Sequence, residues 1–164
     1  MIRLTALEPE DLELLYTIEN DVEMWSVSST NVPYSRFSIR EYLVNQNNDI
    51  YSDKQVRFVI REEDKAVGLI DMFNFSPLHR RAEMGVAILK SERGKGYAED
   101  AIRLLQEYCR ETLGLRQLYC IVPSDNEPSM AMLKRTGFDE TAALRDWLYT
   151  SKGWSEAKML TYMF

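Results

Sequence analysis

The stretch that decides the fold is Ser91-Glu92-Arg93-Gly94-Lys95-Gly96-Tyr97-Ala98. It joins an apolar run typical of a strand, Met84 to Leu89, to an amphipathic run typical of a helix, Ala98 to Thr112. Two glycines at this junction let the backbone turn tightly and approach a ligand closely. Because the N–H groups and the positive dipole end of the following helix face the loop, the stretch predicts an anion site, most often for a phosphate.

Two well-known phosphate motifs do not fit this loop. A Walker loop needs Gly-Lys-Ser/Thr at a fixed distance after a first glycine, and this chain has Gly94-Lys95-Gly96 instead. A dinucleotide fingerprint needs a third glycine and an early place in the chain, whereas this loop follows several predicted strands. What remains is the pattern Arg-x-x-Gly-x-Ala, formed by Arg93, Gly96 and Ala98. For the side chains of Arg93 and Lys95, a solvated turn is the alternative to a role in binding.

The composition is that of a folded domain. The 164 residues are 45% hydrophobic and 28% charged, which suits a single domain, residues 1–164, with one sizeable core. No apolar run is long enough to span a bilayer, and the N-terminus lacks a basic-then-apolar signal, so we expect a cytoplasmic protein with no membrane partner. The net charge of −6 argues against nucleic acid as a partner and is compatible with a cationic acceptor, such as a polyamine or a basic protein.

Cysteine and histidine do not form a metal-binding pattern in this sequence. Cys109 and Cys120 fall on a predicted helix and a predicted strand, where buried free thiols are expected and a disulfide or a reactive thiol is the alternative. His79 is the single histidine, no cysteine pair has zinc spacing, and no acidic pair is placed for magnesium. We therefore expect no metal.

Hydrophobic periodicity predicts the order strand, two helices, three strands, helix, strand, helix and two strands. The predicted strands cover residues 2–6, 55–61, 66–74, 80–89, 118–122, 143–149 and 157–163, and the predicted helices 8–20, 38–47, 98–112 and 126–135. Ser38 is expected to cap the second helix, with Tyr42 and Leu43 facing inward, and Asn48 to Lys54 to form a polar loop. Gly137 is the expected C-cap of the last helix. This is a mixed α/β (α+β) chain with antiparallel strands in its first half.

Three segments, in this order and at these separations, resemble the GCN5-related N-acetyltransferase (GNAT) superfamily. His79 to Ile88 is similar to the fourth strand of the Rim-type ribosomal-protein acetyltransferases and of the spermidine/diamine acetyltransferases. Arg93 to Ala98 is similar to the family's loop for the pyrophosphate of acetyl-CoA. Asn126 to Phe138 is similar to its Asn-x-x-Ser/Ala…Gly-Phe segment, which lies beside the pantetheine arm. The element order resembles the family along essentially the whole chain.

The resemblance implies a GNAT fold, with a central, mostly antiparallel sheet of about seven strands, splayed strands 4 and 5, and about four flanking helices. The pantetheine arm of acetyl-CoA would enter the splay and pair with the backbone of strand 4, where an N–H group would meet the thioester carbonyl. The N–H groups of the loop would hold the pyrophosphate, with charge added by Arg93 and Lys95. Asn126 would bond the cofactor arm or cap its helix. The expected cofactor-binding residues are Val86, Ala87, Ile88, Arg93, Gly94, Lys95, Gly96, Tyr97, Ala98, Asn126 and Ser129.

Acetyl transfer to an amine needs a proton acceptor, because alkylamines are protonated at pH 7 and attack only when neutral. Glu83 is the predicted base, directly or through water, since it alternates with inward apolar residues and would face the acceptor. A pair with Arg80 or Arg81, or orientation of the amine alone, is the alternative. The tyrosine that many family members carry as the acid is replaced here by Leu133. The resemblance to the Rim-type enzymes implies Ser129 as the acid, and a hydroxyl bonded to the helix backbone is its alternative role.

The acceptor is expected against the aromatic N-terminal segment and the final hairpin. The predicted acceptor-binding residues are Trp25, Tyr34 and Glu83. Further candidates are the aromatic residues Tyr42, Phe73, Trp147 and Trp154, with Glu23 and Asp71 as charge partners. Asn31 and Asn74 stand where the spermidine enzymes tend to carry acids of a regulatory polyamine site.

The predicted function is therefore acetyl transfer from acetyl-CoA to a primary amine. A polyamine-like small molecule is favoured over a protein N-terminus. The competing class is a non-catalytic acyl-CoA-binding module, which the departure at Leu133 suggests. A homo-oligomer, a dimer or larger, is kept open as the assembly.

Overall fold

The structure is a computed structural model that describes residues 1–25 and 31–164. Its strands are β1 (Ile2–Thr5), β2 (Val56–Glu62), β3 (Lys65–Ser76), β4 (Arg81–Ile88), β5 (Gln117–Pro123), β6 (Asp139–Thr150) and β7 (Gly153–Met163). Its helices are α1 (Leu12–Glu19), α2 (Arg36–Val44), α3 (Ile50–Asp53), α4 (Tyr97–Glu111) and α5 (Glu127–Arg135), with 3-10 turns η1 (Pro9–Asp11) and η2 (Lys90–Glu92). The predicted order of strands and longer helices is confirmed. Residues 26–30, which belong to the N-terminal segment expected to face the acceptor, lie outside the described residues.

All seven strands form one sheet in the order β1-β2-β3-β4-β5-β7-β6. Every neighbouring pair is antiparallel except β4 and β5, which run parallel. A parallel pair needs a crossover, and α4 supplies it between these two strands. The mixed, mostly antiparallel sheet predicted from the sequence is therefore confirmed.

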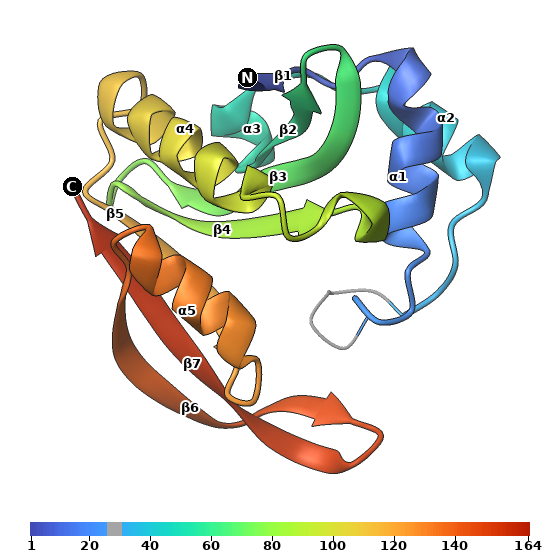
Figure 1. Ribbon diagram of the computed structural model, residues 1–164. Coiled ribbons are helices and arrows are strands. Elements are labelled where there is room, and N and C mark those ends of the chain that lie inside the picture. Colours follow the sequence, from blue (N-terminus) through green and yellow to red (C-terminus); the bar gives the residue numbers. More distant parts are fainter. Residues whose placement is uncertain (26–30) are drawn as a thin grey trace.

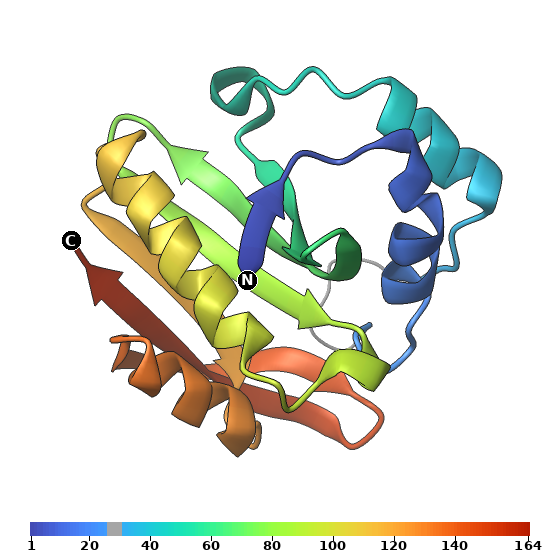
Figure 2. The same ribbon diagram turned by 45° about the horizontal axis from the view of Figure 1, so that its top comes forward.

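The two faces of the sheet are covered by different helices. On one face, α4 and α5 pack over alternate strand residues such as Ile60, Ile70 and Leu118 (Figures 1 and 2). The intervening residues Val59 and Leu69 belong to a smaller cluster with α1 and α2. Since successive strand residues point to opposite faces, α1 and α2 cover only the β2–β3 part of the second face.

Three local predictions in the first half of the chain were wrong. Ser35, not Ser38, caps α2, because its side chain accepts a hydrogen bond from the backbone N–H of Ser38. Tyr42 does not face inward as predicted, because it is 39% exposed; Leu43 packs against the smaller core as predicted, and Ile39 is the buried residue of that helix. The predicted polar loop before β2 contains the single-turn helix α3, which Asp49 caps.

A bulge interrupts β3 shortly before it ends. The register with β4 shifts between Phe73 and Ser76. Met72 and Phe75, three residues apart, both lie in the larger core, whereas a regular strand would put them on opposite faces. One extra residue, Asn74, is therefore inserted, and its φ of 50° is in the left-handed region.

The segment after α5 ends the helix through a glycine. The N–H of Phe138 bonds to the carbonyl of Leu133 at 3.0 Å, and that of Gly137 bonds to Lys134 at 3.0 Å, which is the Schellman pattern. Gly137 has a φ of 91°, as this motif requires. After this turn, Phe138 lies in the core beside Tyr162, with only 1% of its surface exposed. The predicted role of Gly137 at the end of the helix is confirmed, one position beyond the cap residue Thr136.

Both cysteines are buried free thiols, as expected. Burial raises the pKa of the Cys109 thiol to about 12 and raises the pKa of Cys120 as well, so neither is a ready nucleophile. No helix in residues 1–25 and 31–164 is long and apolar enough to cross a membrane.

Replacement of Gly137 by alanine should destabilise the fold more than the same change at Gly153. Both glycines have a positive φ, so each substitution adds left-handed strain of about 1 kcal/mol. A Cβ at Gly137 would also lie 2.9 Å from the Tyr162 ring, which is held between Phe138 and Phe164, whereas a Cβ at Gly153 meets nothing within 4 Å. Urea unfolding should show a loss of roughly 2–4 kcal/mol for Gly137→Ala, against about 1 kcal/mol for Gly153→Ala. Equal losses would contradict this account of the Gly-Phe segment.

Candidate active site

The sheet opens between β4 and β5. The two strands pair only where Arg81, Ala82 and Glu83 lie beside Gln117, Leu118 and Tyr119. Beyond Glu83 and Tyr119 both strands continue, β4 to Ile88 and β5 to Pro123, without a shared ladder. In Figure 1, β4 and β7 lie nearest each other at the end of the sheet close to the C-terminus and diverge toward the opposite end. The splay implied by the resemblance is thus present in the structure.

The opened edge of β4 presents unused backbone groups. The N–H of Leu89 donates to the carbonyl of Val67 in β3. Along an antiparallel strand, the backbone N–H and C=O groups of successive residues face the two edges of the strand in turn. Leu89 and Ala87 therefore face β3, while Val86 and Ile88 face the opening. Among the described residues, only the carbonyl of Ile88 has a partner there, the Nε of Arg93 at 3.1 Å. This edge can accept an extended, amide-containing ligand as an added strand.

The loop after β4 has the conformation that an anion site needs. Gly94 and Gly96 have φ values of 77° and 82°, which L-residues with side chains rarely adopt. Within the described chain, the N–H groups from Gly94 to Ala98 have no protein acceptor, and the first backbone bond of α4 joins Asp100 to Gly96. Gly96 caps α4 without a side-chain bond. A bound anion would satisfy these free donors at the positive end of the helix.

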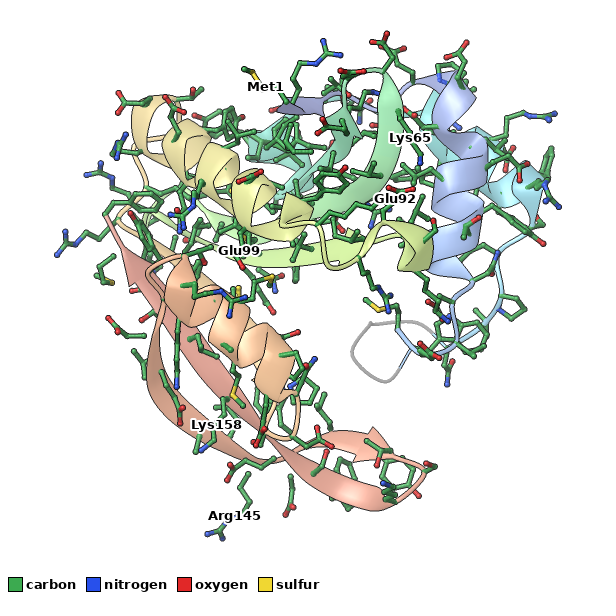
Figure 3. The ribbon with its side chains drawn as sticks, viewed as in Figure 1. Met1, Lys65, Glu92, Glu99, Arg145 and Lys158 are labelled. Carbon is green, nitrogen blue, oxygen red and sulfur yellow. The ribbon has the colours of Figure 1, made fainter. Side chains whose placement is uncertain are left out.

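Glu92 anchors this loop from below. Its carboxylate is buried, and it pairs with Lys65 of β3 and with Lys95 of the loop, the latter at 2.8 Å (Figure 3). Hydrogen bonds from Lys65, and then from Lys95, lower the pKa of Glu92 to about 2. Lys95 is thus committed to an internal ion pair, while Arg93 is the loop cation that reaches the edge of β4.

A pocket of about 450 Å³ lies where this loop meets the end of α1. Its walls come from Thr17, Ile18, Asp21 and Met24 on one side and from Ala87 to Ser91 and Arg93 on the other. Lys90 bridges the two sides through Asp21 and Glu23, at 3.5 and 3.2 Å. The pocket therefore adjoins the end of the opened edge.

Glu83 lies at the point where the sheet opens. It is half-buried, and its Oε2 accepts a hydrogen bond of 2.9 Å from the amide of Asn74. Burial raises the pKa of Glu83, and interactions with Asn74 and Tyr119 oppose that rise. In the described residues Glu83 takes part in no ion pair. Arg80, one of its predicted alternatives, donates instead to the carbonyl of Gly114.

The segment predicted to lie along the cofactor begins α5. Asn126 caps the helix, because its Oδ1 accepts the N–H of Ser129 at 3.3 Å. Within the described residues the Ser129 hydroxyl has no hydrogen-bond partner, so it is available to a ligand. Leu133, where many relatives carry tyrosine, is buried in the core and offers no polar group.

The two predicted acceptor-binding aromatics are each hydrogen-bonded to a residue at the end of α1. The indole Nε1 of Trp25 donates to the carbonyl of Glu19 at 3.1 Å. The backbone of Tyr34 forms two hydrogen bonds with the side chain of Asn20, at 2.8 and 3.0 Å. No hydrogen bond or ring contact joins either aromatic to Glu83 in the described part of the chain.

The other acceptor candidates have separate locations. Phe73 is the β3 partner of Glu83 and its ring lies over Gly85, so it borders the opening. Trp147 and Trp154 are exposed on the β6–β7 hairpin, where Trp154 packs edge-on against Tyr149 at 5.1 Å. Tyr42 lies on α2, and the charges of Arg57, Asp71 and Glu19 act on its hydroxyl group.

The predicted charge partners are already paired. Asp71 forms a two-point ion pair with Arg57, both contacts at 2.7 Å, and Arg57 also binds Glu19 at 2.6 Å. Burial acts to lower the pKa of Arg57, but the carboxylates of Asp71 and Glu19 outweigh it and raise that pKa, so Arg57 stays charged. Glu23 pairs with Lys90. Asp71 is thus largely neutralised before any acceptor arrives.

Two residues beside Glu83 were missed from the sequence. Tyr119 lies in the predicted strand over residues 118–122 and was given no role there, and Asn74 was considered only for a regulatory site. The signal for Tyr119 was a phenol in a central strand, where a buried hydroxyl group usually has a hydrogen-bond partner. The position of Asn74 depends on the bulge in β3, which local sequence does not reveal.

Glu92→Gln should lower the melting temperature by a few degrees near pH 7, because it removes the carboxylate that holds Lys65 and Lys95. The folded pKa lies below the ordinary value of 4.5, so this stabilisation is complete above pH 4.5 and disappears as the pH falls toward 2. The difference in melting temperature between Glu92→Gln and wild type should therefore become smaller as the pH is lowered from about 7 to 3. Glu13→Gln, which breaks the exposed pair with Arg36, is the control with little effect. A difference that stays constant with pH would contradict the anchor.

Comparisons with known proteins agree with this geometry. Residues 2–139 match the family model of the acetyltransferase (GNAT) domain. The spermidine N(1)-acetyltransferase of Escherichia coli K12 is 29% identical over 137 residues, which cover 84% of this chain and 72% of that protein. The putative ribosomal N-acetyltransferase YdaF of Bacillus subtilis is 31% identical over 155 residues, which cover 92% and 84%.

Among solved structures, a spermidine N-acetyltransferase from Vibrio cholerae, in complex with CoA and spermine, has a TM-score of 0.86. It is 24% identical, and the match covers 99% of this chain and 95% of that one. At that identity the likeness shows the fold. The family model, the relatives and the opened sheet together establish that the chain belongs to the GNAT acetyltransferase family and is an N-acetyltransferase that uses acetyl-CoA.

Proposed function

We propose that this enzyme moves an acetyl group from acetyl-CoA to a primary amine of a polyamine-like small molecule, with Glu83 as the base. One observation carries the proposal. The unused edge of β4 leads from the half-buried carboxylate of Glu83, past Val86 and Ile88, to the free N–H groups at the start of α4. The thioester of acetyl-CoA matches the Glu83 end of this edge, and its pyrophosphate matches the N–H groups at the start of α4.

The donor binds along this edge in the proposal. The pantetheine amides pair with Val86 and Ile88, while Ala87 keeps its bonds to β3. The N–H groups from Gly94 to Ala98 hold the pyrophosphate. Arg93 supplies the nearby positive charge, since Lys95 is engaged by Glu92. Asn126 caps α5, and Ser129 in the first turn of that helix is proposed to face the thioester end of the donor.

The reaction needs one proton removed and one supplied. Glu83 takes a proton from the acceptor ammonium, directly or through a water, and the neutral nitrogen then attacks the thioester carbon. A backbone N–H of the opened edge stabilises the oxyanion. The C–S bond breaks, the nitrogen loses its second proton, and the thiolate of CoA gains one. Ser129 is the proposed donor, giving its proton to the thiolate while it takes up the one that the nitrogen loses, because its hydroxyl has no other partner among the described residues.

The environment of Glu83 favours this role. Burial raises its pKa, which makes the carboxylate a stronger base than an exposed glutamate. Its protein contacts are with neutral groups, so no lysine or arginine neutralises it in the described chain. It therefore keeps a negative charge that can attract a cationic amine.

A polyamine-like acceptor is favoured over a protein N-terminus. The relatives named as spermidine acetyltransferases support it, and so does the net charge of −6. The relative named as a putative ribosomal acetyltransferase supports the second candidate, as does the buried Leu133 in place of a tyrosine. Trp25, Tyr34 and Phe73 are the proposed apolar contacts for either acceptor.

Assembly and location are further parts of the proposal. One solved spermidine N-acetyltransferase from Vibrio cholerae is described as dodecameric. We extend a homo-oligomer to this chain as a proposal, without a fixed number of subunits. The cytoplasmic location and the single domain over residues 1–164 also remain predictions.

Release of free CoA thiol should be stimulated by spermidine or spermine more than by a peptide with a free N-terminus. Glu83→Gln should lower kcat/KM for the preferred amine by about 100-fold, the usual contribution of a general base. Its affinity for CoA, measured by calorimetry, should stay unchanged. Glu63→Gln, an exposed carboxylate in the β2–β3 turn, is the matched control.

Three results of this assay would redirect the proposal. Thiol release that no amine stimulates would favour a non-catalytic acyl-CoA-binding module. Stimulation by the peptide but not by polyamines would favour the protein N-terminus. An unchanged rate in Glu83→Gln would remove Glu83 from catalysis while leaving the acetyltransferase intact.

A further inference from the structure

Glu83 and Tyr119 are the last residues that β4 and β5 share. They are register partners in the parallel ladder, and no pair follows them. Their neighbours Ala82, Met84, Leu118 and Cys120 are all buried in the larger core. Since side chains alternate along a strand, Glu83 and Tyr119 both point to the other face of the sheet. The phenol therefore stands beside the carboxylate at the point where the sheet opens.

The bulge in β3 brings a third polar group to this point. Without it, Asn74 would have the same orientation as Met72 and would enter the core. The extra residue, with its left-handed φ of 50°, turns the Asn74 amide out so that Nδ2 donates to Glu83 at 2.9 Å. Bulges next to active sites commonly re-aim one side chain in this way. Tyr119 is the register partner of Glu83 and acts on the pKa of that carboxyl, so the three polar side chains gather at this point of the sheet.

We infer that Tyr119 is a positioning residue for acetyl transfer, which acts with Asn74 to hold the Glu83 carboxylate toward the acceptor amine. The inference rests on the proposed role of Glu83 as the base. A carboxylate on a strand can rotate about its side-chain torsions, and two donors from neighbouring strands fix it in one orientation. Both donors are neutral at pH 7, so they hold the carboxylate without cancelling its charge.

The titratable groups around Glu83 do not mask the titration of Glu83 in a pH profile of the activity. On β3, Asn74 and Phe73 do not titrate, and Asp71 farther along is held by Arg57. On β5, burial raises the pKa of Tyr119 and of the Cys120 thiol, so both stay neutral near pH 7. On β4 itself, the charge of Arg81 acts on Tyr119 and is not among the influences on Glu83. A shift in the acidic limb of the activity profile therefore reports on Glu83.

The test compares the pH profile of kcat/KM for wild type, Tyr119→Phe and the control Tyr108→Phe. Tyr108 lies on α4 against Phe58 and does not touch the cluster. The Tyr119 phenol beside Glu83 lowers the pKa of that carboxyl, so the acidic limb should move to higher pH in Tyr119→Phe only. At pH 7, kcat should fall about tenfold, as expected for one hydrogen bond to a charged group, with CoA affinity unchanged. An unshifted limb overturns the inference.

Asn74→Asp is a second variant that does not depend on Tyr119. Aspartate keeps the size of the side chain and tolerates the left-handed backbone, but it replaces the donor with a like charge beside Glu83. The acidic limb should therefore move further up than in Tyr119→Phe. No movement in a variant that melts like wild type overturns the cluster.

A double-mutant cycle separates this inference from the proposed function. If Tyr119 acts through Glu83, Tyr119→Phe should change the rate little in a Glu83→Gln background. An equal tenfold loss in both backgrounds shows that Tyr119 acts independently and overturns the inference alone. An unchanged rate in Glu83→Gln by itself overturns the role of Glu83, and the positioning role falls with it.

Discussion

The pairing of β4 with β5 stops at Glu83 and Tyr119, and the other functional features depend on that stop. In a continuous sheet, the backbone groups of Val86 and Ile88 would be bonded to β5, because buried backbone groups need partners. Here, in the part of the chain that the structure describes, they are left for a ligand except for the Ile88 carbonyl, which accepts from Arg93. The loop that follows turns at Gly94 and Gly96 into α4, whose first N–H groups are also unused. The early end of the β4–β5 pairing thus provides hydrogen-bonding groups for a ligand from the middle of the sheet to the first turn of α4.

The opening persists because packing fixes each half of the sheet separately. On one side, β4 is paired with β3, and α4 packs across β1, β3 and β4. On the other side, β5 pairs with β7 along its whole length, and Leu133 and Phe138 secure that half in the core. Bonds from Gln106 and Arg103 of α4 to the end of α5 hold the halves at a set separation. The opening is therefore built into the fold, which limits the reorganisation needed on binding.

The sequence predicted those features that depend on local chemistry. Gly94 and Gly96 revealed the loop, and periodicity revealed the order of elements. Ser35 and Ser38 both fit a helix cap, and only the folded backbone decides between them. The pairing of Lys95 with buried Glu92 depends on Lys65 from β3, and the cluster around Glu83 depends on a bulge and a parallel register. Such contacts join strands far apart in the chain, so a local pattern does not contain them.

The central claim is that the free edge of β4 receives acetyl-CoA as an added strand. Backbone amide hydrogen exchange, measured residue by residue with and without CoA, tests it most directly. The account predicts that CoA slows exchange at Val86 and Ile88, whose N–H groups face the opening. Exchange at Ala87, whose N–H already faces β3, should change little. Binding of CoA that leaves Val86 and Ile88 unprotected, or that protects Ala87 equally, would contradict the account.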